Sequence, residues 1–113
     1  MIKDKVKVYA SPYIETSGTH LQGHIRCDYH RLVQAFGKPS EGDGYKTDAE
    51  WRLQFVDGDQ IITTTIYNWK NGKNYNGDDA PDTKNIFDWN IGGYDKRGVL
   101  LVHQIIDGLD SYE

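Results

Sequence analysis

The sequence predicts a small α+β domain, in which an antiparallel β-sheet of four or five strands is built around a long central hairpin and packed by one or two helices. Two alternating apolar runs flank Asp57-Gly58, and Asp-Gly between such runs is the strongest short-range hairpin pattern. Apolar residues at helical spacing predict the helices. Because there are too few apolar residues to cover both faces of the sheet, we expect the helices on one face, with residues 1–113 forming a single domain.

The hairpin runs alternate between a core face and an outer face. A two-residue turn at Asp57-Gly58 places Leu53 opposite Ile62 and Ala49 opposite Ile66, so that both strands direct apolar side chains to the core. A three-residue turn with a bulge would swap the faces of the second strand, but the first register buries two isoleucines beside Trp51. The outer face then carries Glu50, Arg52, Gln54, Ile61, Thr63, Thr65, Tyr67 and Trp69.

The elements before the hairpin are short. Val6, Val8 and Ala10 alternate with Lys5, Lys7 and Tyr9, which is typical of an edge strand whose lysines discourage edge pairing. A second strand is predicted near Gly23 to Cys27. Asp28 is the expected N-cap of a helix with Leu32, Val33 and Phe36 on one side, ended by Gly37 and Pro39, and residues 38–44 are expected to form a surface loop.

Turn signals dominate the chain after the hairpin. Asn71-Gly72, Asn76-Gly77 and the acidic run to Asp82 predict a loop. A strand with Ile86, Phe87, Trp89 and Ile91 follows, closed by Gly92-Gly93. Residues 95–107 then predict a helix, with Asp95 as its cap, Gly108 as its C-terminal glycine, and a stripe of Val99, Val102, Ile106 and Leu109, although the run 99–102 also suits a buried strand.

Composition excludes several function classes. No apolar run approaches the roughly 20 residues that span a bilayer, so we expect no membrane role. The single cysteine, Cys27, and the polar segment Met1–Lys5 indicate a reducing cytosol and no leader. The net charge of -4 argues against general nucleic-acid binding and is too small for a DNA mimic.

Metal and catalytic motifs are absent from the sequence. His20, His24 and His30 surround Cys27 without a zinc-type spacing, so we favour structural or exposed roles and predict no metal or cofactor. The acidic cluster of Asp78, Asp79 and Asp82 lacks the calcium-loop pattern. Asp48 and Glu50 suit a charge ladder with their cationic neighbours better than an acid–base pair, and nothing marks Cys27 as an activated nucleophile. We therefore predict that the protein is not an enzyme.

The segment from Tyr67 to Tyr75 contains more aromatic, Lys and Asn residues than a strand and the following turn require. Its candidate binding residues are Tyr67, Trp69, Lys70, Lys73, Asn74 and Tyr75. Aromatic rings can stack on bases, while the Lys and Asn side chains between them can pair with phosphates. The same aromatic residues also form hot spots of protein interfaces. The alternative is structural: the rings cap the end of the sheet around an Asn-Gly turn.

The runs DAEWRLQF, TIYNWKNGKNYNGDD, THLQGHIRCDYHRLVQAFGKP and WNIGGYDKRGV cover about four fifths of the chain. In them the sequence resembles a family of small, mostly uncharacterised proteins of tailed bacteriophages. This resemblance implies a phage accessory protein in the host cytoplasm. The function that we favour is inhibition of a host defence, by an anti-CRISPR or other anti-defence protein that binds a host protein. A sponge for a nucleotide immune signal and an unrecognised small enzyme are the alternatives, and the oligomeric state is open.

Overall fold

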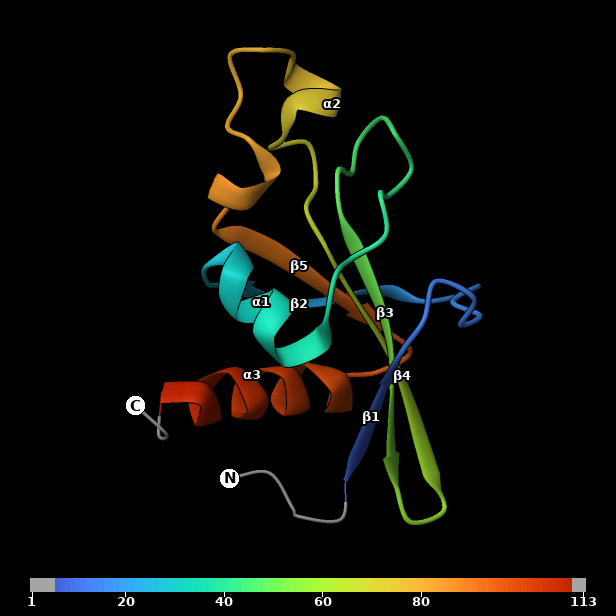
Figure 1. Cartoon of the computed structure of the whole chain (residues 1–113). Coiled ribbons are helices and arrows are strands. Elements are labelled where there is room, and N and C mark those ends of the chain that lie inside the picture. Colours follow the sequence, from blue (N-terminus) through green and yellow to red (C-terminus); the bar gives the residue numbers. More distant parts are fainter. Residues whose placement is uncertain (1–5, 111–113) are drawn as a thin grey trace.

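In the computed structural model, which describes residues 6–110, five strands form one antiparallel sheet in the order β1-β3-β4-β5-β2. The strands are β1 (Lys7–Ala10), β2 (His20–Arg26), β3 (Glu50–Asp57), β4 (Gln60–Tyr67) and β5 (Asp88–Gly93), and the helical elements are α1 (Tyr29–Phe36), α2 (Lys73–Asn76), η1 (Thr83–Asn85, a 3-10 turn) and α3 (Arg97–Asp110). Helices α1 and α3 pack on one face of the sheet (Figure 1). The predicted α+β class is therefore confirmed, while Met1–Lys5 lies outside the described residues.

The central hairpin is present, but its predicted register is wrong by two residues. Leu53 pairs with Thr64, and Ile62 lies opposite Phe55. The loop is Gly58-Asp59 rather than Asp57-Gly58, with Gly58 at φ 60°, which suits glycine at the first loop position of a type II′ turn. Because a shift of two residues preserves the alternation, the core and outer faces of both strands are as predicted.

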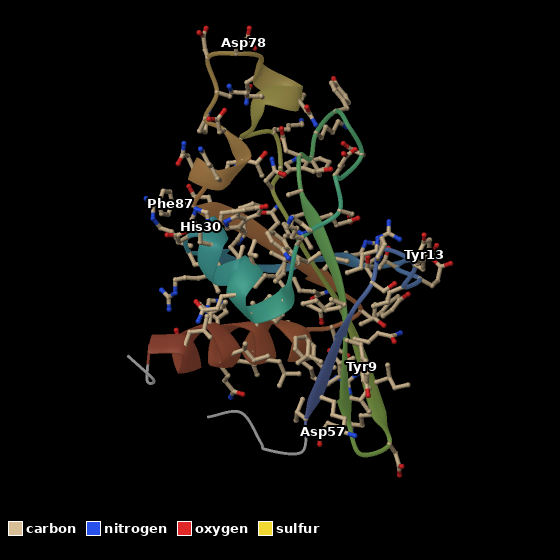
Figure 2. The ribbon with its side chains drawn as sticks, viewed as in Figure 1. Tyr9, Tyr13, His30, Asp57, Asp78 and Phe87 are labelled. Atoms are coloured by element: carbon tan, nitrogen blue, oxygen red, sulfur yellow. The ribbon has the colours of Figure 1, made fainter. Side chains whose placement is uncertain are left out.

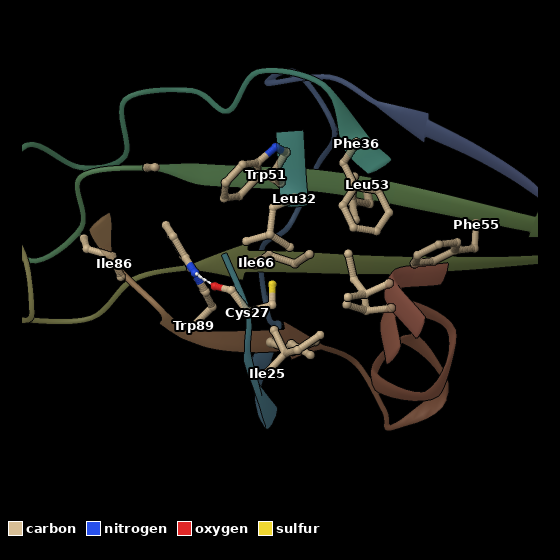
Figure 3. Close-up of a cluster of buried hydrophobic side chains, with 14 of the residues drawn as sticks. Ile25, Cys27, Leu32, Phe36, Trp51, Leu53, Phe55, Ile66, Ile86 and Trp89 are labelled. Carbon is tan, nitrogen blue, oxygen red and sulfur yellow. Dashed lines mark hydrogen bonds between the residues drawn. The ribbon is translucent and has the colours of Figure 1, made fainter. Parts of the chain in front are cut away.

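Two tryptophans form the centre of the core (Figure 3). Trp51 of β3 and Trp89 of β5 meet edge to face with their ring centroids 5.4 Å apart, and each is 1% exposed. Their indole N–H groups are satisfied, since Trp51 Nε1 donates to the Gly37 carbonyl at 2.7 Å and Trp89 Nε1 to the Cys27 carbonyl at 3.1 Å. Each bond joins the sheet to a residue next to an end of α1, so the tryptophans set the position of this helix.

Helix α1 has the predicted ends. The Asp28 carboxylate accepts the His30 N–H at 2.7 Å as N-cap, and Gly37, at φ 84°, returns its N–H to the Val33 carbonyl at 2.8 Å. Arg31 of α1 donates to the Ile106 carbonyl of α3 at 3.0 Å, which joins the two helices.

Helix α3 is a helix as predicted, and its stripe of Val99, Val102, Ile106 and Leu109 packs against the core. The Asp95 carboxylate accepts the Arg97 N–H at the start of the helix. The expectation that Gly108 ends the helix is wrong. The helix continues to Asp110 because Gly108 lacks the left-handed conformation that a glycine terminator adopts.

Three further boundaries differ from prediction. Residues 71–85 are not entirely loop, since they contain α2 and η1. Strand β2 begins at His20, because the bulge between Leu21 and Gly23 lets the strand resume pairing with β5. Gly92 and Gly93 lie inside β5 and pair with both β4 and β2, whereas Ile86 and Phe87 precede this strand.

Replacing Trp51 with alanine should remove the central core contact. We expect Trp51→Ala to lower the free energy of unfolding by about 3 to 5 kcal/mol. A loss of this size should unfold most molecules of so small a domain. Thermal denaturation followed by circular dichroism measures the loss. Trp69→Ala is the matched control, because Trp69 is 44% exposed, and it should shift the melting temperature little. Equal effects of the two variants would contradict the assigned core.

Two glycines of α3 should respond oppositely to alanine. A Cβ at Gly98 would press into the side chain of Thr64, so Gly98→Ala should destabilise the protein by about 1 to 3 kcal/mol through overpacking. A Cβ at Gly108 meets open space, and Gly108→Ala should stabilise the helix by about 0.5 to 1 kcal/mol. Urea denaturation of both variants checks the contrast, and stabilisation by Gly98→Ala would show that α3 does not lie this close to β4.

Candidate functional site

The face of the sheet opposite the helices contains a hollow of about 320 Å³. Its floor is formed by side chains that alternate with the core positions of β3 and β4: Glu50, Arg52, Thr65 and Tyr67. The segments 16–21 and 42–47 and the ring of Trp69 form its walls. The hollow therefore lies on the outer face that the sequence predicts, at the end of the sheet that holds Tyr67 and Trp69.

Gly92 keeps the floor of the hollow open. It pairs with Thr65 across β4 and β5, and a Cβ at this position would approach the Thr65 hydroxyl to 2.5 Å. Any side chain at Gly92 would therefore displace Thr65 or occupy the hollow. This close approach explains why a glycine stands inside β5.

Arg52 is held at the floor by two contacts. Its Nε donates to Glu50 Oε1 at 3.0 Å, and its Nη1 donates to the Ile14 carbonyl at 3.2 Å. Ile14 is itself buried and belongs to the segment between β1 and β2 that crosses this face. The hollow thus contains a guanidinium and a carboxylate that largely balance each other.

The Asp43 carboxylate orders the wall formed by residues 43–47. Its Oδ1 accepts the N–H groups of Tyr45, Lys46 and Thr47 at 2.8, 2.9 and 3.0 Å. These bonds, that from Thr47 most strongly, hold the pKa of Asp43 below its usual value. They fix the direction in which Tyr45 and Lys46 leave the backbone.

The buried amide of Asn68 connects this wall to the end of β4. Asn68 is 0% exposed, and its Oδ1 accepts the N–H groups of Asp48 and Ala49 at 2.7 and 3.1 Å. Its Nδ2 donates to Asp48 Oδ1 at 2.8 Å and to Asn71 Oδ1 at 3.1 Å. All the hydrogen-bonding capacity of the amide is therefore used inside the chain.

Residues from both sides of this network form one surface, the aromatic–lysine patch, defined as Tyr45, Lys46, Tyr67, Trp69, Lys70 and Tyr75. The rings of Tyr45 and Tyr75 lie 5.4 Å apart, and those of Tyr67 and Trp69 lie 6.2 Å apart. Tyr45, Trp69 and Tyr75 are 58, 44 and 39% exposed, so their rings are available to a partner. Such a group of exposed aromatics is unusual outside binding surfaces.

Lysine side chains connect the rings. Lys46 Nζ lies 5.3 Å from the Trp69 ring centroid and 5.7 Å from that of Tyr45. Lys70 Nζ lies 5.8 Å from Trp69 and 5.3 Å from Tyr75. Lys70 is also the one non-glycine residue within 6–110 with a positive φ, at 58°, and its N–H donates to the Lys46 carbonyl at 2.8 Å. Uncommon backbone conformations of this kind cluster at functional sites.

The candidate residues fall into two groups. Tyr67, Trp69, Lys70 and Tyr75 lie in the patch, where burial raises the pKa of Tyr67 above its usual value. Lys73 forms an ion pair with Asp82 at 2.8 Å, and Asn74 donates to Asp48 Oδ2 and to the Thr47 carbonyl. These two residues have structural partners, and their role in binding stays a prediction.

Tyr45, Lys46 and Arg52 were missed as site residues. In the observed register, extending the pairing of Glu50 with Tyr67 along both strands brings Lys46 close to Lys70, but the predicted register does not contain this pairing. Arg52 was placed on the outer face, but no pattern showed that the segment around Ile14 would fold over it.

The other titratable clusters do not converge. Within residues 6–110, no three His, Cys, Asp or Glu side chains are placed to hold a metal ion. Asp78, Asp79 and Asp82 are exposed, and Asp78 lies at the outer tip of the segment between α2 and η1 (Figure 2). None of the described helices is both long enough and apolar enough to cross a membrane.

Comparisons of the chain with protein-family models, with curated proteins and with solved structures gave no significant match.

Replacing Asn68 with aspartate tests the network with an isosteric side chain. The new carboxylate lacks the two N–H donors of the amide, which bind Asp48 and Asn71, and it faces the carboxylate of Asp48. Asn68→Asp should therefore destabilise the protein by about 2 to 4 kcal/mol at neutral pH. Burial beside Asp48 raises the pKa of the new carboxyl in the folded state, so the destabilisation should diminish as the pH falls and the carboxyl is protonated. Urea denaturation across acidic pH measures both effects.

Asn85→Asp is the control for this variant, because Asn85 is exposed. It should change stability by a few tenths of a kcal/mol and without this pH dependence. An Asn68→Asp protein as stable as the parent at neutral pH would contradict the assigned network.

Proposed function

We propose that this chain is a non-enzymatic binding protein that docks on a partner protein through the aromatic–lysine patch and the adjoining hollow. The single observation that carries the proposal is the fixed presentation of three exposed aromatic rings beside two lysines at the mouth of a hollow. Aromatic residues dominate the hot spots of protein interfaces because they bury a large area at a small cost in conformational entropy. Their position on rigid backbone lowers this cost further.

We further propose that the partner is a component of a host defence and that docking inhibits it in the host cytoplasm. The support is the resemblance to small tailed-phage proteins in the runs around TIYNWKNGKNYNGDD, which contains four of the six patch residues. Inhibition by docking requires a surface and no reaction.

The chemistry of the remaining groups favours binding over catalysis. Cys27 is buried, and burial raises the pKa of its thiol to about 11, so the thiolate nucleophile is scarce at neutral pH. The Cys27 thiol is therefore not suited to act as a nucleophile or a general base at neutral pH. The Glu50 carboxylate in the hollow is paired with Arg52.

A nucleotide sponge is the second candidate, because Lys46 and Lys70 beside Trp69 can pair with phosphate while the ring stacks on a base. The hollow disfavours this interpretation, since its two carboxylates, of Asp43 and Glu50, outnumber its one guanidinium, of Arg52, and leave no net positive charge for a phosphate. Native mass spectrometry of the protein purified from infected cells separates the candidates. A partner chain supports docking, and a small phosphorylated ligand supports the sponge.

Truncation of the aromatic anchors should abolish the proposed function. We expect Trp69→Ala or Tyr67→Ala to weaken partner binding by about thirtyfold or more, since anchors of this kind contribute about 2 kcal/mol or more each. Folding should persist because both side chains lie off the core face. A phage-protection assay beside calorimetry with the captured partner measures the loss.

Tyr13→Ala is the matched control for these variants. Tyr13, labelled in Figure 2, is 93% exposed, lies in the segment after β1, and belongs neither to the patch nor to the lining of the hollow. Its replacement should leave protection and affinity unchanged. Full activity of folded Trp69→Ala and Tyr67→Ala proteins would place the binding surface elsewhere and reduce the patch to a cap on the sheet.

A further inference from the structure

The charges of Lys46 and Lys70 are not neutralised within the described chain. Ion pairs of the described side chains include those of Arg26 with Asp88, Arg52 with Glu50, Lys73 with Asp82 and Arg97 with Asp95, and neither Lys46 nor Lys70 takes part in one of these. Lys46 and Lys70 have aromatic faces in place of a carboxylate. Two cations close to one exposed indole ring leave an unbalanced positive charge in the middle of the patch.

The backbone holds these two cations together. The hydrogen bond from the Lys70 N–H to the Lys46 carbonyl joins the two residues directly, and Asn76 Nδ2 donates to the Lys70 carbonyl at 2.7 Å. The ammonium groups lie 5.3 and 5.8 Å from the centroid of the same Trp69 ring. Two lysines that extend from joined backbone positions toward one ring bind an anionic partner at a smaller entropic cost than two lysines on unconnected segments do.

We propose that the patch recognises an acidic segment of its protein partner, with carboxylates bound by Lys46 and Lys70 while neighbouring apolar atoms pack on Trp69 and Tyr75. This inference rests on the proposed docking function and specifies the chemistry of the docked segment. Complementary charge gives such an interface its specificity and speeds association.

The surroundings of the patch favour an acidic polypeptide over a nucleic acid. A nucleic-acid strand needs a row of cations along its backbone, whereas this surface offers two lysines. The hollow beside them contains the carboxylates of Asp43 and Glu50 and, paired with Glu50, the guanidinium of Arg52, so it offers no net positive charge to a continuing phosphate chain, and the whole chain has a net charge of -4. An acidic segment can place a carboxylate at the lysines and a neutral polar side chain in the hollow.

Nuclear magnetic resonance titration of the isotope-labelled full chain tests this inference. Decaglutamate is the probe, and decaglutamine and a ten-residue oligothymidylate are the comparison ligands. The indole N–H signal of Trp69 reports on the patch, while the buried indoles of Trp51 and Trp89, which donate to carbonyls in the core, are internal references. We expect decaglutamate to shift the Trp69 signal alone, with an affinity that falls as salt is added.

Charge variants make the test specific. Lys46→Gln with Lys70→Gln should weaken decaglutamate binding by about fivefold or more, because each exposed charge pair contributes modestly. Lys46→Arg with Lys70→Arg should retain it. Lys84→Gln with Lys96→Gln is the matched control, since it removes two exposed charges that lie outside the patch.

Three results would overturn the inference: equal shifts with decaglutamine, binding of oligothymidylate at least as tight as that of decaglutamate, or full affinity of the double Gln variant. These failures are distinct from failure of the docking proposal. If docking is correct and the partner segment is not acidic, Trp69→Ala still abolishes phage protection while the double Gln variant retains it.

Discussion

The aromatic–lysine patch depends on one buried side chain, the amide of Asn68. An asparagine amide offers two donors and accepts two hydrogen bonds, and here all four are made to Asp48, Ala49 and Asn71. A buried polar group that is fully satisfied fixes its neighbours in one arrangement, because any other arrangement leaves a group unpaired at a cost of about 1 to 3 kcal/mol. The amide therefore determines how the segment before β3 meets the segment after β4. Tyr45 and Lys46 lie shortly before β3, and Trp69 and Lys70 lie shortly after β4. Because Asn68 fixes the junction between these two segments, it also fixes the geometry of the patch.

The sheet divides stability and recognition between its two faces. Core residues of β3 and β4, with Trp89 of β5, pack against α1 and α3, which removes the large apolar side chains from water. The same strands direct Arg52, Thr65 and Tyr67 to the other face, where the glycine at position 92 leaves space for the hollow. Because neighbouring residues of one strand serve different faces, a substitution at the hollow is separated from the core by the thickness of the sheet. This separation lets the residues of the proposed docking surface vary without loss of the fold.

Much of the fold was predictable, because the hydrophobic alternation of β3 and β4 and the Asp28 cap are local signals. The register was not, since shifting the turn from Asp57-Gly58 to Gly58-Asp59 moves the pairing by two residues and leaves every face unchanged. Asn74 was interpreted as a binding residue from the composition of its segment, but its partner Asp48 lies far away in the sequence. Lys46 belongs to the patch only because the two strands continue toward each other beyond the hairpin. Pairwise contacts of this kind are set by tertiary structure and leave no periodic trace in the sequence.

Hydrogen–deuterium exchange of the chain, alone and with the partner protein recovered from infected cells, measures directly whether the face of the sheet opposite the helices is the docking surface. The account predicts slower exchange on binding in residues 43–47 and 65–75, which surround the hollow and the patch, with little change in α1 and α3. Protection confined to the exposed sides of α1 and α3, or to the outer edge of β1, would contradict it.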